Sequence, residues 1–155
     1  MEKKLILLVE DNKKVQKLNR RMLERNNFTV GAAVTLADAR AFLTRQVPAA
    51  IILDIGMPDG NGLDFLRELR KTSKILVLIL TGYRADLDFA MELTAGLDDL
   101  LPKPYEFEVL LGRLKRLLQN AHLNLIGILK NIFTSGSLSS ATANGHSTVV
   151  LSYTM

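Results

Sequence analysis

The chain of 155 residues contains no cysteine and no tryptophan, and it has few aromatic residues of any kind. Without thiols it can form neither a disulfide framework nor a thiolate metal centre, which fits the reducing cytoplasm that we expect as its location. Long hydrophobic runs are missing too. The N-terminal run Leu5–Val9 is followed by acids and is too short for a signal peptide or a membrane span. We therefore expect no membrane association.

A strong excess of one charge is also absent. The net charge is +4, and the basic residues are spread over predicted helices such as 13–25 and 67–74. This distribution favours solvated helix faces over a nucleic-acid-binding patch. Apolar residues make up 48% of the chain and charged residues 23%, as in soluble globular proteins. The length suits one compact domain with a short appendage.

Short apolar runs alternate with amphipathic stretches along the first 120 residues. The runs are Leu5–Val9, Thr29–Ala33, Ala49–Leu53, Ile75–Leu80 and Asp99–Leu101. Helical patterns lie at 13–25, 63–70, 87–93 and 107–118, and a further one, the second along the chain, opens at Thr35. In the first of these, Val15, Leu18 and Met22 share one face, and the second opens with Thr35 and Asp38 as in a capping box. Five βα units in a row predict an α/β fold, a doubly wound five-stranded parallel sheet with helices on both faces.

Polar side chains follow the predicted strands at their carboxyl ends, where open parallel sheets bind ligands. They are Glu10, Asp11, Asp54, Thr81 and Lys103. Three carboxylates at one edge repel one another unless a cation balances them, and a hard divalent ion such as Mg²⁺ suits oxygen ligands. Asp54 can then stay ionised as a nucleophile, with Lys103 and Thr81 contacting an incoming phosphoryl group. The sequence predicts a Mg²⁺-dependent phospho-aspartate switch at Asp54.

Each of these residues also has a simpler interpretation. Asp54 suits a helix N-cap or a turn, and Glu10 or Asp11 suits the N-cap of a helix that starts near residue 12. Thr81 alone suits a turn at a strand end, and Lys103 alone suits the surface. N-capping by one acid is compatible with metal binding by both. The gathering of all five at one edge favours the functional interpretation.

Several ordered motifs match a known family. They are Val9-Glu10-Asp11-Asn12, Leu53-Asp54-Ile55-Gly56-Met57-Pro58-Asp59-Gly60-Asn61-Gly62, Leu80-Thr81-Gly82, Gly96-Leu97-Asp98-Asp99 and Pro102-Lys103-Pro104-Tyr105. With these motifs, residues 3–120 resemble the receiver domain of bacterial two-component response regulators, which has a flavodoxin-like fold. The helix at 106–118 resembles the last receiver helix of the OmpR/PhoB subfamily. The resemblance implies a receiver domain over residues 1–120.

The resemblance assigns roles to individual residues. It implies that Asp54 is the phosphoacceptor, which receives its phosphoryl group from a sensor histidine kinase. Mg²⁺ is then held by Glu10, Asp11, Asp54 and the backbone carbonyl of Gly56. Thr81 and Lys103 are the catalytic residues, and the Lys103-Pro104 peptide bond is expected to be cis.

One position departs from the family pattern. An aromatic residue usually stands three positions before the lysine, and here that position is Leu100. Phosphorylation should survive this change, whereas the usual aromatic readout is in doubt. OmpR/PhoB regulators dimerise through their last two helices and the strand between them, and Asp98, Asp99 and Arg113 occupy matching interface positions. We expect a homodimer on activation, although Phe89 stands where a basic residue is common.

The tail, residues 121–155, has a different character. Residues 122–133 are apolar and extend the predicted last helix, and a region rich in Ser, Thr, Gly and Asn follows. Residues 136–154 resemble the small N-terminal sheet of a winged-helix DNA-binding domain, and a disordered or foreign tail explains them equally well. No recognition helix follows. DNA binding is therefore expected only where a complete output domain is present.

Two alternative functions compete with the switch. A Mg²⁺-dependent aspartyl-phosphate phosphatase or hydrolase usually carries a second acid two residues after the nucleophile, and here that residue is Gly56. An unphosphorylated scaffold, a pseudo-receiver, is disfavoured by the intact acids, although Leu100 is compatible with it. We expect no enzymatic turnover beyond self-catalysed phosphorylation and dephosphorylation.

Overall fold

The computed structural model describes residues 2–82, 93–94, 96–134, 140–143 and 146–149, with side chains up to residue 121. The chain divides into two compact units, Met1–Gln119 and Asn120–Met155. The predicted helix at 87–93 falls almost entirely outside the described residues. Among the residues that are described, no helix has the length and apolar composition needed to cross a membrane.

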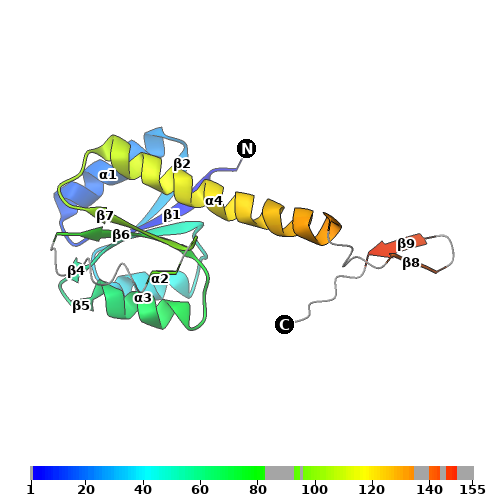
Figure 1. Ribbon diagram of the computed structural model, residues 1–155. Helices are drawn as coiled ribbons and strands as arrows, with labels where there is room; N and C mark the ends of the chain where they lie inside the picture. The colour runs from blue at the N-terminus through cyan, green and yellow to red at the C-terminus, as the bar shows by residue number, and fades with distance from the viewer. Residues whose placement is uncertain (1, 83–92, 95, 135–139, 144–145, 150–155) are drawn as a thin grey trace. The chain divides into compact units, whose positions relative to one another are not determined.

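A parallel sheet forms the centre of the first unit (Figure 1). Its strands are β1 (Lys4–Val9), β2 (Phe28–Ala33), β3 (Ala50–Asp54), β6 (Leu76–Thr81) and β7 (Asp98–Pro102). Their order across the sheet is β2-β1-β3-β6-β7, and every neighbouring pair is parallel. Each predicted apolar run matches one strand to within one residue at either end. The predicted doubly wound, five-stranded fold is confirmed.

Helices cover both faces of this sheet. Helix α1 (Lys13–Arg25) and the first turns of α4 (Phe107–Thr134) lie on one face, and α2 (Leu36–Leu43) and α3 (Gly62–Arg70) lie on the other (Figure 1). Helix α4 continues beyond the predicted 107–118 segment through the apolar stretch that follows it. Because the central strands are covered on both sides, β3 and β6 are buried at every position.

The predicted apolar face of α1 is partly wrong. Leu18 is 61% exposed, whereas Asn19 is 5% exposed and Leu23 is fully buried. The helix is therefore rotated so that a polar side chain occupies a core position. Sequence periodicity favoured Leu18 because an apolar residue is the usual occupant of a buried helix position.

A short hairpin of β4 (Gly56–Met57) and β5 (Gly60–Asn61) links β3 to α3. A Cβ atom at Gly62 would lie 2.8 Å from Ile55 Cα and 2.9 Å from the carbonyl oxygen of Asp54, so only glycine allows this close approach. At the hairpin tip, the Asp59 carboxylate accepts hydrogen bonds from the backbone N–H groups of Leu36, at 2.8 Å, and Ala37, at 3.0 Å. These contacts hold the hairpin against the start of α2.

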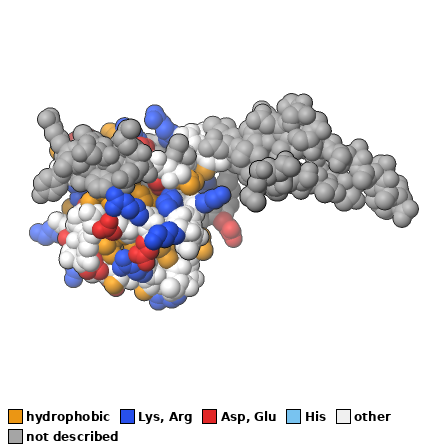
Figure 2. Space-filling model, turned by 60° about the horizontal axis from the view of Figure 1, so that its bottom comes forward, with side chains coloured by type: hydrophobic (Ala, Val, Ile, Leu, Met, Phe, Trp, Pro, Cys, Tyr) orange, Lys and Arg blue, Asp and Glu red, His pale blue; other side chains and the backbone are white. Residues whose placement is uncertain are grey.

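The start of α2 also confirms the predicted cap, because Thr35 Oγ1 accepts a hydrogen bond from the Asp38 N–H at 3.0 Å. The face that carries α2 and α3 mixes both charges (Figure 2). Arg40 lies 3.1 Å from Glu68, and Arg67 lies 2.9 Å from Asp64. This face therefore carries the solvated, mixed-charge helix surface that the sequence predicted.

In the second unit, β8 (Ser140–Ala143) and β9 (His146–Val149) form an antiparallel pair. Both strands lie within residues 136–154, the region whose sequence resembles a small sheet. The likeness of this region to a winged-helix domain stays a prediction.

The Asp59 contacts generate a stability prediction. The Leu36 and Ala37 N–H groups hold the pKa of Asp59 below its ordinary value of 3.8. The ionised carboxylate therefore stabilises the fold above that ordinary pKa, and this stabilisation is lost as the pH falls through the lower folded-state value. We expect Asp59→Ala to lower the urea midpoint at neutral pH but not in strong acid. Asp64→Ala is the exposed control, and an equal loss in both variants would contradict the capping role.

Candidate functional site

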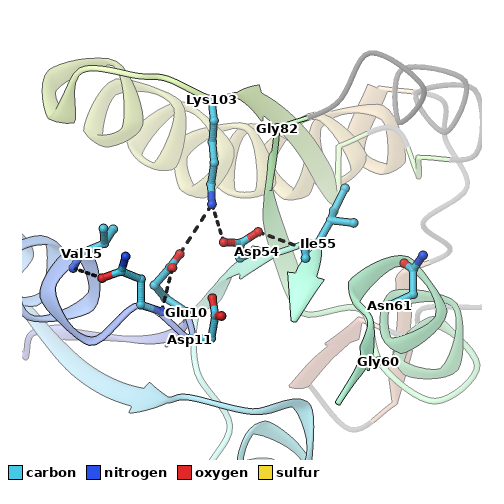
Figure 3. A pocket seen from close by; sticks show the side chains of 11 residues that line it. Glu10, Asp11, Val15, Asp54, Ile55, Gly60, Asn61, Gly82 and Lys103 are labelled. Carbon is cyan, nitrogen blue, oxygen red and sulfur yellow. Dashed lines mark hydrogen bonds and ion pairs between the residues drawn. The ribbon is translucent and has the colours of Figure 1, made fainter. Parts of the chain in front are cut away.

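The predicted polar residues from three strand ends come together in one cavity. Glu10 and Asp11 follow β1, Asp54 ends β3, and Lys103 follows β7. All four line a cavity of about 720 Å³. Figure 3 shows Lys103 pointing from its loop toward the carboxylates of Glu10 and Asp54, with Asp11 beside them. The parallel pairing of β1 with β3 places these acids side by side, because Val9 is in register with Leu53.

The three acids crowd one another. Glu10, Asp11 and Asp54 each offer a carboxylate oxygen, and these oxygens lie within 4.8 Å of one another. Glu10 and Asp54 are buried, at 2% and 6% exposure, whereas Asp11 is exposed. Burial, together with the adjacent Asp54 carboxyl, raises the pKa of Glu10 to about 7. Glu10 Oε2 is buried and accepts no hydrogen bond from the described residues.

This donor set fits a hard divalent cation. Mg²⁺ prefers oxygen ligands and keeps several waters, which an open cavity with one exposed and two buried carboxylates allows. A buried carboxylate oxygen without a hydrogen bond is the group that such an ion would satisfy. Gly56, the fourth predicted ligand, lines the same cavity. Its N–H donates a hydrogen bond to Asp54 Oδ1 at 3.1 Å, which fixes the orientation of that carboxylate.

Lys103 is the counter-charge inside the cavity. Its ammonium forms an ion pair with Asp54 Oδ2 and lies 3.9 Å from Glu10 Oε2. Burial alone lowers the pKa of Lys103, but the contacts with Asp54 and Glu10 outweigh it and leave that pKa raised. The backbone N–H of Lys103 donates to the carbonyl of Thr81 at 2.7 Å. The Lys103-Pro104 peptide bond is cis, as predicted.

The helix N-cap roles considered for the acids are not observed. Asn12 is the N-cap of α1, where its side-chain oxygen accepts from the N–H groups of Lys14, at 3.1 Å, and Val15, at 3.2 Å. Asn61 is the N-cap of α3. Glu10, Asp11 and Asp54 therefore cap neither helix, and all three face the cavity.

Some contributing residues were missed in the sequence. The N–H of Asn12 donates to Glu10 Oε1 at 3.1 Å. Gln16 Nε2 donates to the carbonyls of Glu10, at 3.0 Å, and Ala33, at 3.1 Å, so it ties together the ends of β1 and β2. The sequence does show two polar residues, Asn12 and Gln16, one helical turn apart at the start of α1. They were not predicted to contribute because isolated amide side chains are usually solvated.

The remaining predicted residues lie beside the cavity or away from it. Thr81 ends β6 and is 2% exposed, and it is not among the lining residues, whereas its neighbour Gly82 is. Leu100 packs against the hydrophobic cluster between the sheet and helices α2 and α3. Asp98 and Asp99 make ion pairs away from the cavity. The Asp98 side chain is 1% exposed and pairs with Arg70, and Asp99 Oδ1 lies 3.3 Å from Arg113 Nη1.

The raised pKa of Glu10 predicts a pH-dependent stability in the absence of divalent ions. Between 4.5 and about 7, the folded state keeps a proton on Glu10 that the unfolded chain releases. The Glu10 contribution to the free energy of unfolding therefore falls as the pH rises through this window. We expect urea unfolding with a chelator, at about pH 5 and about pH 8, to show this fall in the wild type and a smaller one in Glu10→Gln. Equal slopes in the two proteins would contradict the assignment.

Comparison with known proteins identifies the family. Residues 6–115 match the family model described as the response regulator receiver domain. The chain is 37% identical over 117 residues to the transcriptional regulatory protein CpxR of Klebsiella pneumoniae subsp. pneumoniae, which is 76% of this chain and 50% of that protein. It is 36% identical over 110 residues to KdpE, the KDP operon transcriptional regulatory protein of Escherichia coli, which is 71% and 49% of the two chains. The chain spans about half the length of these curated relatives.

Solved structures agree with this result. The receiver domain of a Francisella response regulator matches with a TM-score of 0.69 at 25% identity, over 76% of this chain and 98% of that one. The response regulator TrrA of Thermotoga maritima, in complex with Mg²⁺–BeF, matches with a TM-score of 0.63 at 26% identity, over 74% and 98% of the two chains. Together with the sheet order and the acidic cavity, these matches show that the chain belongs to the response regulator receiver domain family.

Proposed function

We propose that Asp54 accepts a phosphoryl group from a sensor histidine kinase in a Mg²⁺-dependent reaction, and that this switches an output surface. One observation carries the proposal. Three carboxylates and the Lys103 ammonium meet in an open cavity at the carboxyl edge of the sheet, and one buried carboxylate oxygen there accepts no hydrogen bond from the described residues. Such a cluster suits a cation and a doubly charged phosphoryl group better than it suits a neutral ligand.

The proposed transfer uses the groups of the cavity in distinct ways. A carboxylate oxygen of Asp54 forms the new P–O bond while the P–N bond of a phosphohistidine donor breaks, and the bonding electrons go to the imidazole nitrogen. When bound by Glu10, Asp11, Asp54 and the Gly56 carbonyl, Mg²⁺ supplies positive charge that offsets the charge of the acids and the phosphoryl group.

Two other residues would complete the site. The Lys103 ammonium contacts Asp54 in the unmodified protein. Because the Lys103 side chain is 33% exposed, its ammonium can shift from the Asp54 carboxylate to a negatively charged phosphoryl oxygen. Thr81 ends the strand next to Asp54, because Leu80 is in register with Asp54. From there we propose that its hydroxyl binds a phosphoryl oxygen once the group is in place.

The alternative functions gain little support. A phosphatase or hydrolase of the type considered needs an acid at position 56, and Gly56 offers only backbone groups there. A passive scaffold has no need for three crowded carboxylates and their ammonium partner, since the crowding costs stability. The curated relatives CpxR and KdpE are described as transcriptional regulatory proteins. We therefore propose a switch without turnover of an external substrate.

Phosphoryl acceptance predicts a simple mass change. Incubation of the full chain with acetyl phosphate and Mg²⁺ should add the mass of one phosphoryl group, because the Asp54 carboxylate is the cavity acid that accepts a hydrogen bond from Lys103. The adduct should disappear in Asp54→Asn and with a chelator, and it should persist in Asp64→Asn, which changes an exposed acid on α3. An adduct that survives in Asp54→Asn would refute the assignment, and steady release of phosphate would favour the hydrolase.

The proposed output function, regulation of transcription, rests on the curated relatives. Because the matched region covers only about half of each regulator, we propose that the receiver, residues 1–120, is coupled to a DNA-binding output domain that regulates transcription in the cytoplasm. Residues 121–155 would then form the linker and the start of that domain, with β8 and β9 as its first hairpin.

We also propose that phosphorylation favours a homodimer through α4, β7 and the segment that precedes β7. Asp99 and Arg113 are 26% and 39% exposed, so they can pair across such an interface. Asp98 is a poorer candidate than the sequence predicted, because its carboxylate is enclosed by its ion pair with Arg70. The interface is thus assigned to Asp99 and Arg113.

Sedimentation tests the dimer. We expect the full chain to sediment as a larger species with Mg²⁺ and beryllofluoride than without them, because the phosphoryl mimic favours the associating conformation. Arg113→Ala should weaken this association by about tenfold in dissociation constant, the upper range for a partly exposed charged pair. Arg20→Ala, on α1, is the control because that side chain is also in an exposed ion pair. A monomer under both conditions would contradict the proposal.

A further inference from the structure

Helix α1 buries an amide that the phosphoryl chemistry does not use. Asn19 is 5% exposed and occupies a position where an apolar residue was expected. Its Nδ2 donates a hydrogen bond to the hydroxyl oxygen of Tyr105 at 3.0 Å, across 86 residues of sequence. A buried amide without a partner is destabilising, so the helix and the loop after β7 each depend on this contact.

Tyr105 lies in the loop that carries Lys103. On the upstream side, the Lys103 N–H is held by the carbonyl of Thr81 at 2.7 Å. On the downstream side, the hydrogen bond of the Tyr105 hydroxyl with Asn19 ties the loop to α1. The lysine therefore stands between two anchors, a backbone hydrogen bond to the sheet and a side-chain hydrogen bond to a helix.

The same helix also holds the acids. Asn12, Gln16 and Asn19 are four and three residues apart, so they follow one side of the helix. The Asn12 N–H donates to the Glu10 carboxylate, and the Gln16 side chain donates to the Glu10 backbone carbonyl. The Asn19 side chain donates to Tyr105, in the loop that carries Lys103. The N-terminal half of α1 thereby contacts both Glu10 and the loop that carries the Lys103 ammonium.

Packing alone does not hold the loop in this place. A second cavity of about 580 Å³ is lined by Asn19, Lys103 and Tyr105, together with residues of α1 and the start of α4. Among the residues that the structure describes, no side chain fills the side of the loop that faces this cavity. A directional contact such as the Asn19 hydrogen bond is therefore the restraint that fixes the position of the loop there.

We propose that Asn19 and Tyr105 form a positioning pair that sets where Lys103 stands relative to Asp54 and Glu10. The consequence for phosphoryl transfer rests on the proposed function above. Neither residue touches the reacting atoms. When the Asn19–Tyr105 hydrogen bond is lost, the loop can move. The Lys103 ammonium then leaves the position in which it neutralises the incoming phosphoryl group.

The Tyr105→Phe variant of the full chain tests the pair by two measurements. Amide hydrogen exchange of residues 101–107 should become several-fold faster, because the loop loses one anchor. The initial rate of acetyl phosphate-dependent modification at saturating Mg²⁺ should fall by about tenfold. The Mg²⁺ concentration for half-maximal rate should stay unchanged, since Asn12 and Gln16 still hold Glu10. A general loss of folding would not lower the initial rate at saturating Mg²⁺ while leaving the Mg²⁺ concentration for half-maximal rate unchanged.

Two further variants distinguish positioning from stability. Asn26→Ala removes another side-chain hydrogen bond of α1, to the Met22 carbonyl at 2.8 Å, and should leave the rate and the loop exchange unchanged. In an Asn19→Leu background, Tyr105→Phe should have little additional effect, because the partner is already gone. Unchanged loop exchange in Tyr105→Phe, independent effects of the two substitutions, or an equal loss in Asn26→Ala would overturn the proposal.

The two proposals fail in different ways. If the wild type accepts no phosphoryl group, the proposed function fails, and the hydrogen exchange of residues 101–107 still decides whether the pair holds the loop. If the wild type is modified but Tyr105→Phe behaves like it in both measurements, only the positioning pair fails.

Discussion

Mutual repulsion among Glu10, Asp11 and Asp54 is the constraint on which the rest of this fold depends. Their oxygens lie within 4.8 Å of one another, and two of the three side chains are buried. Lys103 offsets part of the charge, but Glu10 still has a raised pKa and a carboxylate oxygen without a hydrogen bond from the described residues. Bringing these groups together costs free energy that a bound cation can return, which couples the stability of the fold to its ligand.

The scaffold around this cluster is built to resist that repulsion. Asp54 ends β3, which is buried at every position, and Glu10 and Asp11 follow four buried residues of β1, so the backbones that carry the acids cannot shift apart easily. Helix α1 holds the Glu10 loop through Asn12 and Gln16. On the other side of Asp54, the close approach of Gly62 brings the start of α3 against the backbone of Asp54 and Ile55. Rigid elements thus surround the cavity, as a preorganised site requires.

We propose that a phosphoryl group is sensed here by a route other than the usual aromatic exchange. Leu100 packs against the apolar cluster under α2 and α3, and it has no polar end to prefer solvent in one state. Nearby, Asp98 is enclosed by Arg70, and its Oδ2 accepts from the Thr94 N–H at 3.1 Å. This buried network joins α3 to the start of β7. Breaking one partner of such a pair is costly, so the segment it holds should respond as a unit.

The sequence by itself determined the architecture and the acidic edge. Apolar runs defined all five strands of the central sheet, and the residues at their ends included the four charged side chains of the cavity, because parallel strands end at a common edge. Tertiary structure alone decided the partners of the polar side chains. Local sequence patterns did not show that α1 buries Asn19 and exposes Leu18. They also did not show that the Asp59 carboxylate contacts the start of α2, or that Asp98 forms a buried ion pair with Arg70. Each depends on a group distant in sequence, and the cost of burying a polar atom is removed only when folding brings that partner within hydrogen-bonding distance.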